Sequence, residues 1–272
     1  MTDTTAAESR KLDIGRVIGG TFSAIGRNFA TFAILGVVLV GIPTTILMIV
    51  QGPAVAAQTA AIESGTFNLG SSYFVNMGLA GIALLISAAV LQAALIHVVV
   101  QDSAGKPATV GEALATGLRA FLPLLLVSLL YGLLVGLGMV LLIVPGIMIA
   151  VALCVCVPAV VADRVGVFGS LKRSRDLTRG NRWRIFGLFV VLFLLLMVLG
   201  VIVATVVGVT ALTNPAALQD PALSMNPIYI ALNVLQQIIS TVIGAALISV
   251  LYVELRKAKD GLGSRELADI FN

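Results

Sequence analysis

Long apolar runs, separated by short polar or charged segments, dominate the chain. A helix needs about 20 mostly apolar residues to cross the roughly 30 Å hydrocarbon layer of a bilayer, because lipid offers its backbone groups no hydrogen-bond partners. Six runs reach this length or come close to it, at residues 29–50, 73–100, 121–144, 147–162, 185–209 and 228–253. The pattern predicts an all-α integral membrane protein with six transmembrane helices.

The third and fourth apolar runs are separated only by Pro145 and Gly146. Proline ends a helix because it lacks an amide hydrogen, and glycine tolerates a tight reversal of the chain. We therefore expect the chain to turn back at this pair, so that the six helices form three hairpins.

The overall composition excludes a soluble fold. Hydrophobic residues make up 59% of the 272 positions and charged residues 11%, whereas about a quarter of an average soluble domain is charged. No stretch between the apolar runs is long enough for a soluble domain, so we expect residues 1–272 to form a single membrane domain. The sequence before residue 28 lacks the pattern of a cleaved signal peptide, which predicts that the first helix is retained.

The basic residues are distributed on one side of the predicted topology. All 17 lysines and arginines lie in the amino-terminal segment, the second and fourth connections and the carboxyl tail. Such residues accumulate on the cytoplasmic side of a membrane. The distribution predicts a multi-pass membrane protein with both termini in the cytoplasm.

A shorter segment with apolar residues at helical spacing precedes each odd-numbered run, as in helices that lie in the membrane interface. We accordingly divide the chain into an amphipathic cytoplasmic segment (1–28), hairpin 1 (29–100), an interfacial helix with hairpin 2 (101–162), a basic interfacial helix with hairpin 3 (163–253) and a cytoplasmic tail (254–272). The apolar positions are Ile14, Ile18, Phe22 and Ile25; Val110, Leu114, Leu118 and Phe121; and Phe168, Leu171 and Leu177.

An aspartate followed three residues later by glycine occurs after each even-numbered run. The recurrence indicates one unit, an interfacial helix followed by a transmembrane hairpin, that is used three times. The pairs are Asp102 and Gly105, Asp163 and Gly166, and Asp260 and Gly263.

Residues 163–184 hold seven basic side chains and two acidic ones. One interpretation is that this charge only fixes the topology. The sharper hypothesis is that the segment binds the anionic head groups of membrane lipids, with a tryptophan seated at the interface. Nucleic acid is not expected as a partner beside two membrane helices. The candidate head-group residues are Lys172, Arg173, Arg175, Arg179, Arg182, Trp183 and Arg184.

Amide and hydroxyl side chains, rather than charged ones, occupy the middle of the apolar runs. Asn233, Gln237 and Ser240 share one helical face, and Gln92 lies in the second run. They could form hydrogen bonds between helices or line a polar path. Gly132 and Gly136 indicate close helix packing. A single histidine, His97, makes a metal site improbable, and no cofactor-binding or catalytic motif is visible.

The basic segment and the turn before it resemble the membrane-domain family named for glycerophosphoryl diester phosphodiesterase, together with related bacterial membrane proteins. The closing stretch Glu254-Leu255-Arg256, with Tyr252 before it, is also similar. That family's membrane region can be joined to a catalytic barrel, for which this chain has no room. The resemblance therefore implies a membrane module concerned with lipid or envelope functions. Its residues are Pro145, Gly146, Ile147, Pro158 to Val161, Leu171, Arg173, Ser174, Leu177, Thr178, Gly180, Asn181, Trp183 and Ile185.

Together these patterns favour a non-catalytic membrane protein without a cofactor, which acts as a lipid-contacting scaffold or accessory subunit. Its expected partners are membrane lipids with anionic head groups, and either a second copy of the chain or another membrane protein. The alternative is a transporter or channel-like component with a polar path along the sixth run. Pro145, Gly146, Pro158 and Asn181 are expected to be structural.

Overall fold

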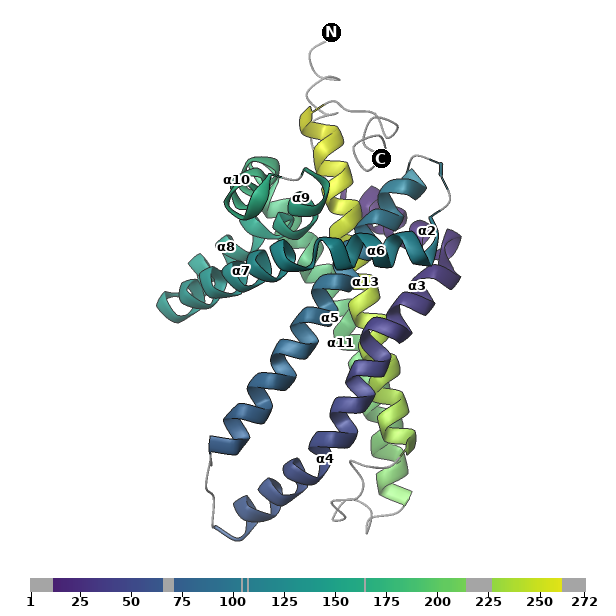
Figure 1. Ribbon diagram of the computed structural model, residues 1–272, viewed down its shortest axis with the longest axis vertical. Helices are drawn as coiled ribbons and strands as arrows, with labels where there is room; N and C mark the ends of the chain where they lie inside the picture. Colours follow the sequence, from purple (N-terminus) through teal and green to yellow (C-terminus); the bar gives the residue numbers. More distant parts are fainter. Residues whose placement is uncertain are drawn as a thin grey trace. The chain divides into compact units, whose positions relative to one another are not determined.

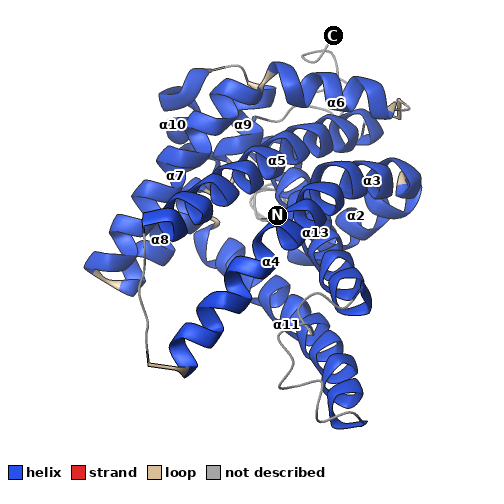
Figure 2. Cartoon of the chain, turned by 60° about the horizontal axis from the view of Figure 1, so that its bottom comes forward, coloured by secondary structure: helices blue, strands red, loops and turns tan. Residues whose placement is uncertain are grey.

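The computed structural model describes residues 12–65, 71–103, 105–106, 108–163, 165–213 and 227–260, and every regular element in these ranges is helical (Figure 2). The elements are α2 (Ile14–Arg27), α3 (Phe29–Gly36), the π-helix η1 (Val37–Gly41), α4 (Ile42–Glu63), α5 (Ser71–Ser103), α6 (Val110–Arg119), α7 (Phe121–Leu141), α8 (Ile143–Leu153), α9 (Cys156–Ala162), α10 (Gly166–Thr178), α11 (Arg182–Thr213) and α13 (Pro227–Asp260) (Figure 1).

Six helical stretches are long and apolar enough to cross a membrane, and each overlaps one of the predicted runs. They are Phe29–Ala54, Phe74–Ser103, Phe121–Leu141, Ile143–Ala162, Arg182–Val206 and Pro227–Lys259. The prediction of an all-α chain with six membrane-length helices is confirmed at this level for the described residues.

The reversal between α7 and α8 lies three residues before the predicted position. Leu142 has an extended backbone (φ −162°, ψ 137°), and α8 begins at Ile143. Pro145 therefore lies in the first turn of α8, where an amide hydrogen would have no helical partner in any case. Gly146 is helical, and its place is fixed by close packing: a β-carbon there would come within 2.7 Å of the Met139 backbone nitrogen.

The contacts among residues divide the chain into two units. Unit 1 comprises Met1–Leu35, Ala89–Leu192 and Val242–Asn272, and unit 2 comprises Gly36–Ala88 and Phe193–Thr241. Unit 1 holds almost all of the fully buried side chains among the described residues. Its core includes Leu91, Leu95 and Ile96 of α5 and Leu251 and Leu255 of α13, which are completely or almost completely enclosed.

Three short helices of unit 1, α2, α6 and α10, share a packing pattern. Each buries small or hydroxyl-bearing residues and exposes a large apolar one. Gly117 of α6, for example, is so close to α5 that a β-carbon would come within 2.8 Å of the Val90 carbonyl oxygen. The exposed residues are Phe22 of α2, Leu118 of α6 and Phe168 of α10, the last with 79% of its surface accessible.

The start of α6 has a capping box formed by Thr109 and Glu112. The Thr109 hydroxyl accepts a hydrogen bond from the Glu112 amide, and the Glu112 carboxylate accepts one from the Thr109 amide. This second bond, together with the Thr109 hydroxyl, lowers the pKa of Glu112. The carboxylate is therefore charged, and the cap intact, above the usual titration range of glutamate.

Within unit 2 the described helices expose many of their large apolar side chains, including Ile46, Leu79, Phe193 and Val201. Such a surface is typical of helices whose solvent is lipid. The contacts that hold them together involve small residues, as at Gly41, where a β-carbon would come within 2.9 Å of the Ile238 side chain. Gly132 and Gly136, predicted to pack closely, lie in unit 1 instead and have no atom within 4 Å of a β-carbon position.

Candidate lipid-contact site

The break between α8 and α9 determines how α10 packs. Pro158 has no amide hydrogen, so the helix cannot continue regularly through the preceding turn, and Val155 departs from helical geometry (φ −105°, ψ 18°). The Ser174 hydroxyl accepts from the Val155 amide at 3.3 Å and donates to the Ala152 carbonyl at 3.0 Å. Thr178 donates to the same carbonyl at 3.1 Å. These bonds replace the lost helical ones and fix α10 beside the break.

The turn between α10 and α11 holds the chain that leads into α2. The Asn181 side-chain oxygen accepts a hydrogen bond from the Leu12 amide at 3.2 Å, and Arg184 donates to the Leu12 carbonyl at 2.7 Å. Asn181 and Leu12 are both buried. Gly180 permits the turn because its φ is +90°, a conformation that residues with a β-carbon rarely adopt. Arg184, a candidate head-group residue, therefore has a backbone partner.

Replacing Asn181 with alanine should loosen this attachment. Without the amide oxygen, the Leu12 N–H loses its acceptor in a buried position, which costs about 1–3 kcal/mol. We expect faster hydrogen exchange in residues 12–20 of Asn181→Ala, measured by mass spectrometry in detergent. Asn233→Ala is the matched control, because the Asn233 side chain donates to the Tyr229 carbonyl of its own helix. Equal exchange in the two variants would contradict the attachment.

A second cluster joins α9, α10 and α13 around Asp163. Its carboxylate accepts from Arg173 Nε at 3.1 Å and pairs with Arg256 Nη1 at 2.9 Å. Arg256 also donates to the Tyr252 hydroxyl at 3.1 Å. The side chains of Asp163 and Arg256 are each only 8% exposed. Arg173, predicted to face lipid head groups, is therefore engaged inside unit 1.

The same arrangement recurs at Asp102, the first of the Asp-x-x-Gly positions. Arg27 binds its carboxylate with two nitrogens, at 3.0 and 2.5 Å, and Asn28 donates to it at 3.0 Å. The hydrogen bond with Asp102 raises the pKa of Arg27. Gly105 follows with φ +73° and closes the end of α5, as glycine commonly does at helix ends.

Two of the three Asp-x-x-Gly positions thus have a shared structure. In both, the aspartate ends a long apolar segment and binds an arginine from another helix, and the glycine has a positive φ, +73° at Gly105 and +72° at Gly166. Gly263 lies outside the described residues, as does the side chain of Asp260. The sequence repeat identified these positions as equivalent but gave no sign of the arginine partners.

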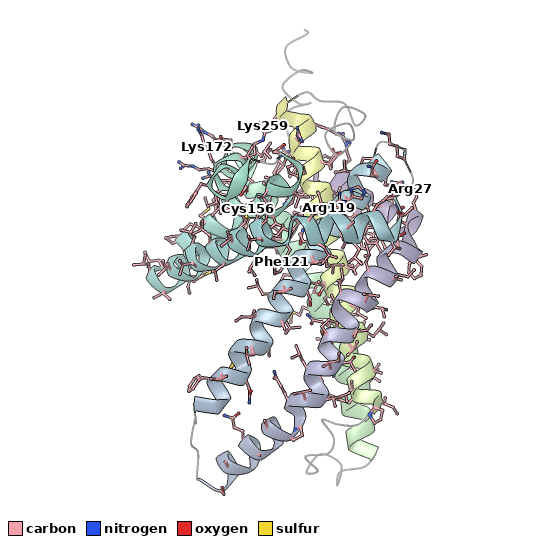
Figure 3. The ribbon with its side chains drawn as sticks, in the orientation of Figure 1. Arg27, Arg119, Phe121, Cys156, Lys172 and Lys259 are labelled. Carbon is pink, nitrogen blue, oxygen red and sulfur yellow. The ribbon has the colours of Figure 1, made fainter. Side chains whose placement is uncertain are left out.

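The other four basic side chains that the structure describes in this segment line a pocket of about 530 Å³. Four cationic groups and one carboxylate face it, beside an aromatic ring. Trp183 is 78% exposed and makes an edge-to-face contact with Phe186, at 6.1 Å between ring centres. Figure 3 shows Lys172 at the surface of α10. The lining residues are Met148, Lys172, Arg175, Asp176, Arg179, Gly180, Arg182 and Trp183.

The structure thereby divides the seven head-group candidates. Five of them meet at one pocket, whereas Arg173 binds Asp163 and Arg184 binds the Leu12 carbonyl. The sequence did not reveal Leu12 as the partner of Asn181 and Arg184, because Leu12 takes part through its backbone. It did not reveal Arg256 as the partner of Asp163, because the two residues are 93 positions apart.

The polar residues of the sixth apolar run lie in unit 2. Asn233 donates to the Tyr229 carbonyl one turn earlier at 2.9 Å, Ser240 is half-buried, and Gln237 is exposed. Gln92, in unit 1, donates to the Ala245 carbonyl of α13 at 3.4 Å. Gln92 therefore makes a contact between helices, whereas the bond of Asn233 stays within α13.

Within the described part of the chain, six apolar helices of membrane length and the apolar side chains exposed along them define a multi-pass helical membrane protein. A family model described as a domain of unknown function, DUF7847, matches residues 12–255. The chain therefore belongs to this uncharacterised family.

A UPF0259 membrane protein of Pectobacterium carotovorum subsp. carotovorum (strain PC1) is 30% identical to the chain over 131 residues. The aligned region is 45% of this chain and 52% of the relative, so the match spans about half the length of that protein. No solved structure matches the chain. These findings support an uncharacterised bacterial membrane protein family, and the resemblance to the glycerophosphoryl diester phosphodiesterase membrane domain stays a prediction from the residues quoted above.

Proposed function

We propose that this protein is a non-catalytic, lipid-contacting scaffold or accessory subunit of the bacterial cytoplasmic membrane. Both termini and the basic connections lie on the cytoplasmic side in this proposal. The observation that carries it is the pocket at which Lys172, Arg175, Arg179 and Arg182 meet beside Trp183. Its ligand is the phosphate-bearing head group of an anionic lipid.

The charge of the pocket supports this ligand. Four cations and a single carboxylate, Asp176, line it, so a net positive charge remains after internal pairing. Arginine guanidinium groups recognise phosphate oxygens through two parallel hydrogen bonds. Each basic residue near an anionic leaflet contributes about 1 kcal/mol.

The surroundings of the pocket support a position at the membrane surface. A charged side chain at the centre of a bilayer costs about 2.5–3.5 kcal/mol on translocon scales, so four of them are tolerated only near the head groups. Tryptophan is enriched at that depth, and Trp183 is exposed there. Phe168, on the same helix as Lys172, offers a large exposed apolar surface that would enter the lipid.

The ion pairs at the helix ends support a structural rather than a catalytic function. The carboxylates of Asp102 and Asp163, the acidic groups most enclosed by the helix ends, are bound by arginines. Each of these carboxylates is engaged by arginine side chains that hold helices together. Helices fixed by such pairs provide a stable surface on which a second copy or another membrane protein could assemble.

The proposal predicts that the double variant Arg175→Gln, Arg179→Gln loses affinity for anionic lipid. Removing two cations worth about 1 kcal/mol each should weaken binding about 30-fold. The measurement is the rise in unfolding temperature when an anionic phospholipid is added to the purified protein in detergent, with a zwitterionic phospholipid as reference.

The matched control is Arg119→Gln, Lys259→Gln, which removes the same charge from exposed positions outside the pocket. This variant should keep the full stabilisation by anionic lipid. If both double variants lose it equally, the effect belongs to net charge and the pocket is not the site.

A further inference from the structure

The turn between α7 and α8 has an unusually apolar composition for the end of a membrane helix. Residues 140–144 are each at least 66% exposed, and residues 132–153 contain no polar side chain. The other connections that lack lysine and arginine, at residues 51–72 and 210–227, carry glutamine, threonine, serine and asparagine. A turn exposed to water would be expected to do the same.

The charged helix α10 contacts the carboxyl-terminal part of α8. Its Ser174 and Thr178 bond to the Ala152 carbonyl, which places the carboxyl-terminal half of α10 level with the break after α8. Met148 of α8 lines the same pocket as Lys172 and Arg175. The cationic side chains therefore lie level with α8 from Ala152 back to Met148.

The distance from this level to the turn is short. Six residues separate Met148 from Leu142, which corresponds to about 9 Å of helix, whereas the hydrocarbon layer is about 30 Å thick. If Ile143–Ala162 crossed the whole layer, Met148 would lie beyond the midplane, and the guanidinium groups beside it would lie in the hydrocarbon. Burying these charges costs several kcal/mol, which argues against this placement.

We propose that α7 and α8 form a re-entrant hairpin, which enters and leaves the bilayer on the side of the basic pocket. The apolar turn at residues 140–144 ends within the hydrocarbon and contacts acyl chains. Gly138 and Gly146 let the two helices approach closely, since a β-carbon on Gly138 would come within 2.9 Å of the Gly146 α-carbon. Figure 1 shows α7 and α8 side by side.

This inference goes beyond the proposed function, because it needs only the cost of placing charge in hydrocarbon and not a bound head group. Four full crossings then remain, at Phe29–Ala54, Phe74–Ser103, Arg182–Val206 and Pro227–Lys259. An even number of crossings leaves both ends of the chain on one side of the membrane, and a re-entrant hairpin returns to the side from which it enters. The basic connections therefore keep a common side.

Fluorescence quenching by brominated lipids measures the depth of the turn. Leu142→Trp and the control Phe74→Trp are each made together with Trp183→Phe, so that each protein has a single tryptophan. In reconstituted vesicles we expect the Leu142→Trp protein to be quenched most by bromine deep in the acyl chains, and the Phe74→Trp protein by bromine near the head groups. Equal, shallow quenching of both proteins would overturn the proposal.

Labelling of cells with a membrane-impermeant thiol reagent gives an independent readout if the tryptophan variants fail to fold. Leu142→Cys should resist labelling from outside, whereas Ser64→Cys, at the exposed end of α4, should be labelled. The native Cys154 and Cys156 are buried and stay in place. Labelling of Leu142→Cys to the same extent as Ser64→Cys would show a full crossing and exclude the re-entrant hairpin.

Discussion

Asp163→Asn should destabilise the protein more than Asn181→Ala or Gly146→Ala. The carboxylate is bound by Arg256 at 2.9 Å and Arg173 at 3.1 Å, and the Arg256 side chain is only 8% exposed. Removing one partner of a buried ion pair leaves an uncompensated charge and costs about 3–5 kcal/mol. The measurement is the midpoint of thermal unfolding in detergent, followed by the helical circular-dichroism signal.

Asp176→Asn is the control for Asp163→Asn, because it removes the other acidic side chain of the basic segment from an exposed position. Its unfolding midpoint should equal that of the unmodified protein. A double variant, Asp163→Leu with Arg256→Met, should be more stable than Asp163→Asn, since replacing both partners leaves less unpaired charge. If Asp163→Asn and Asp176→Asn unfold alike, Asp163 does not hold the three helices together.

Gly146→Ala should open the α7–α8 hairpin. A β-carbon at this position would come within 2.7 Å of the Met139 backbone nitrogen and of the Met139 sulfur. The side chain can rotate away, but the backbone nitrogen moves only if the helices separate. Overpacking of this kind typically costs about 1–3 kcal/mol, and we expect a lower unfolding midpoint in the same assay.

Gly136→Ala is the matched control, on the neighbouring helix of the hairpin. No atom lies within 4 Å of its β-carbon position, and alanine favours helix by up to about 1 kcal/mol over glycine. The midpoint of this variant should be unchanged or slightly raised. A Gly146→Ala protein as stable as Gly136→Ala would contradict the close approach of the two helices.

The helices were predictable because membrane-length apolar runs have few alternative structures. Their ends were predicted less well: the turn expected at Pro145 and Gly146 lies at Leu142. Proline there starts a helix as readily as it ends one, and an uninterrupted apolar sequence does not distinguish these cases. Close helix packing was predicted at Gly132 and Gly136, whereas the structure places it at Gly138. Residue spacing alone does not show which face of a helix meets its neighbour.

The charge of the basic segment was visible in the sequence. Which of its cations pair within the fold and which line the pocket was not. Arg173 and Arg175 are two positions apart on α10, so they point to different sides of the helix. Arg173 meets Asp163, whereas Arg175 lines the pocket. The partner residues come from other helices, and only the fold brings them together. Charge counting therefore predicted where lipid contact is plausible but not which cations are free for it.

The basic residues labelled in Figure 3 lie toward one end of unit 1: Arg27, Arg119, Lys172 and Lys259. The central claim is that, among such residues, those at the pocket bind anionic lipid. Native mass spectrometry of the protein extracted from membranes in mild detergent tests this most directly. Bound phospholipid should be present on the unmodified protein and on the control double variant Arg119→Gln with Lys259→Gln. It should be lost from the pocket double variant Arg175→Gln with Arg179→Gln. Undiminished phospholipid on the last variant would contradict the account.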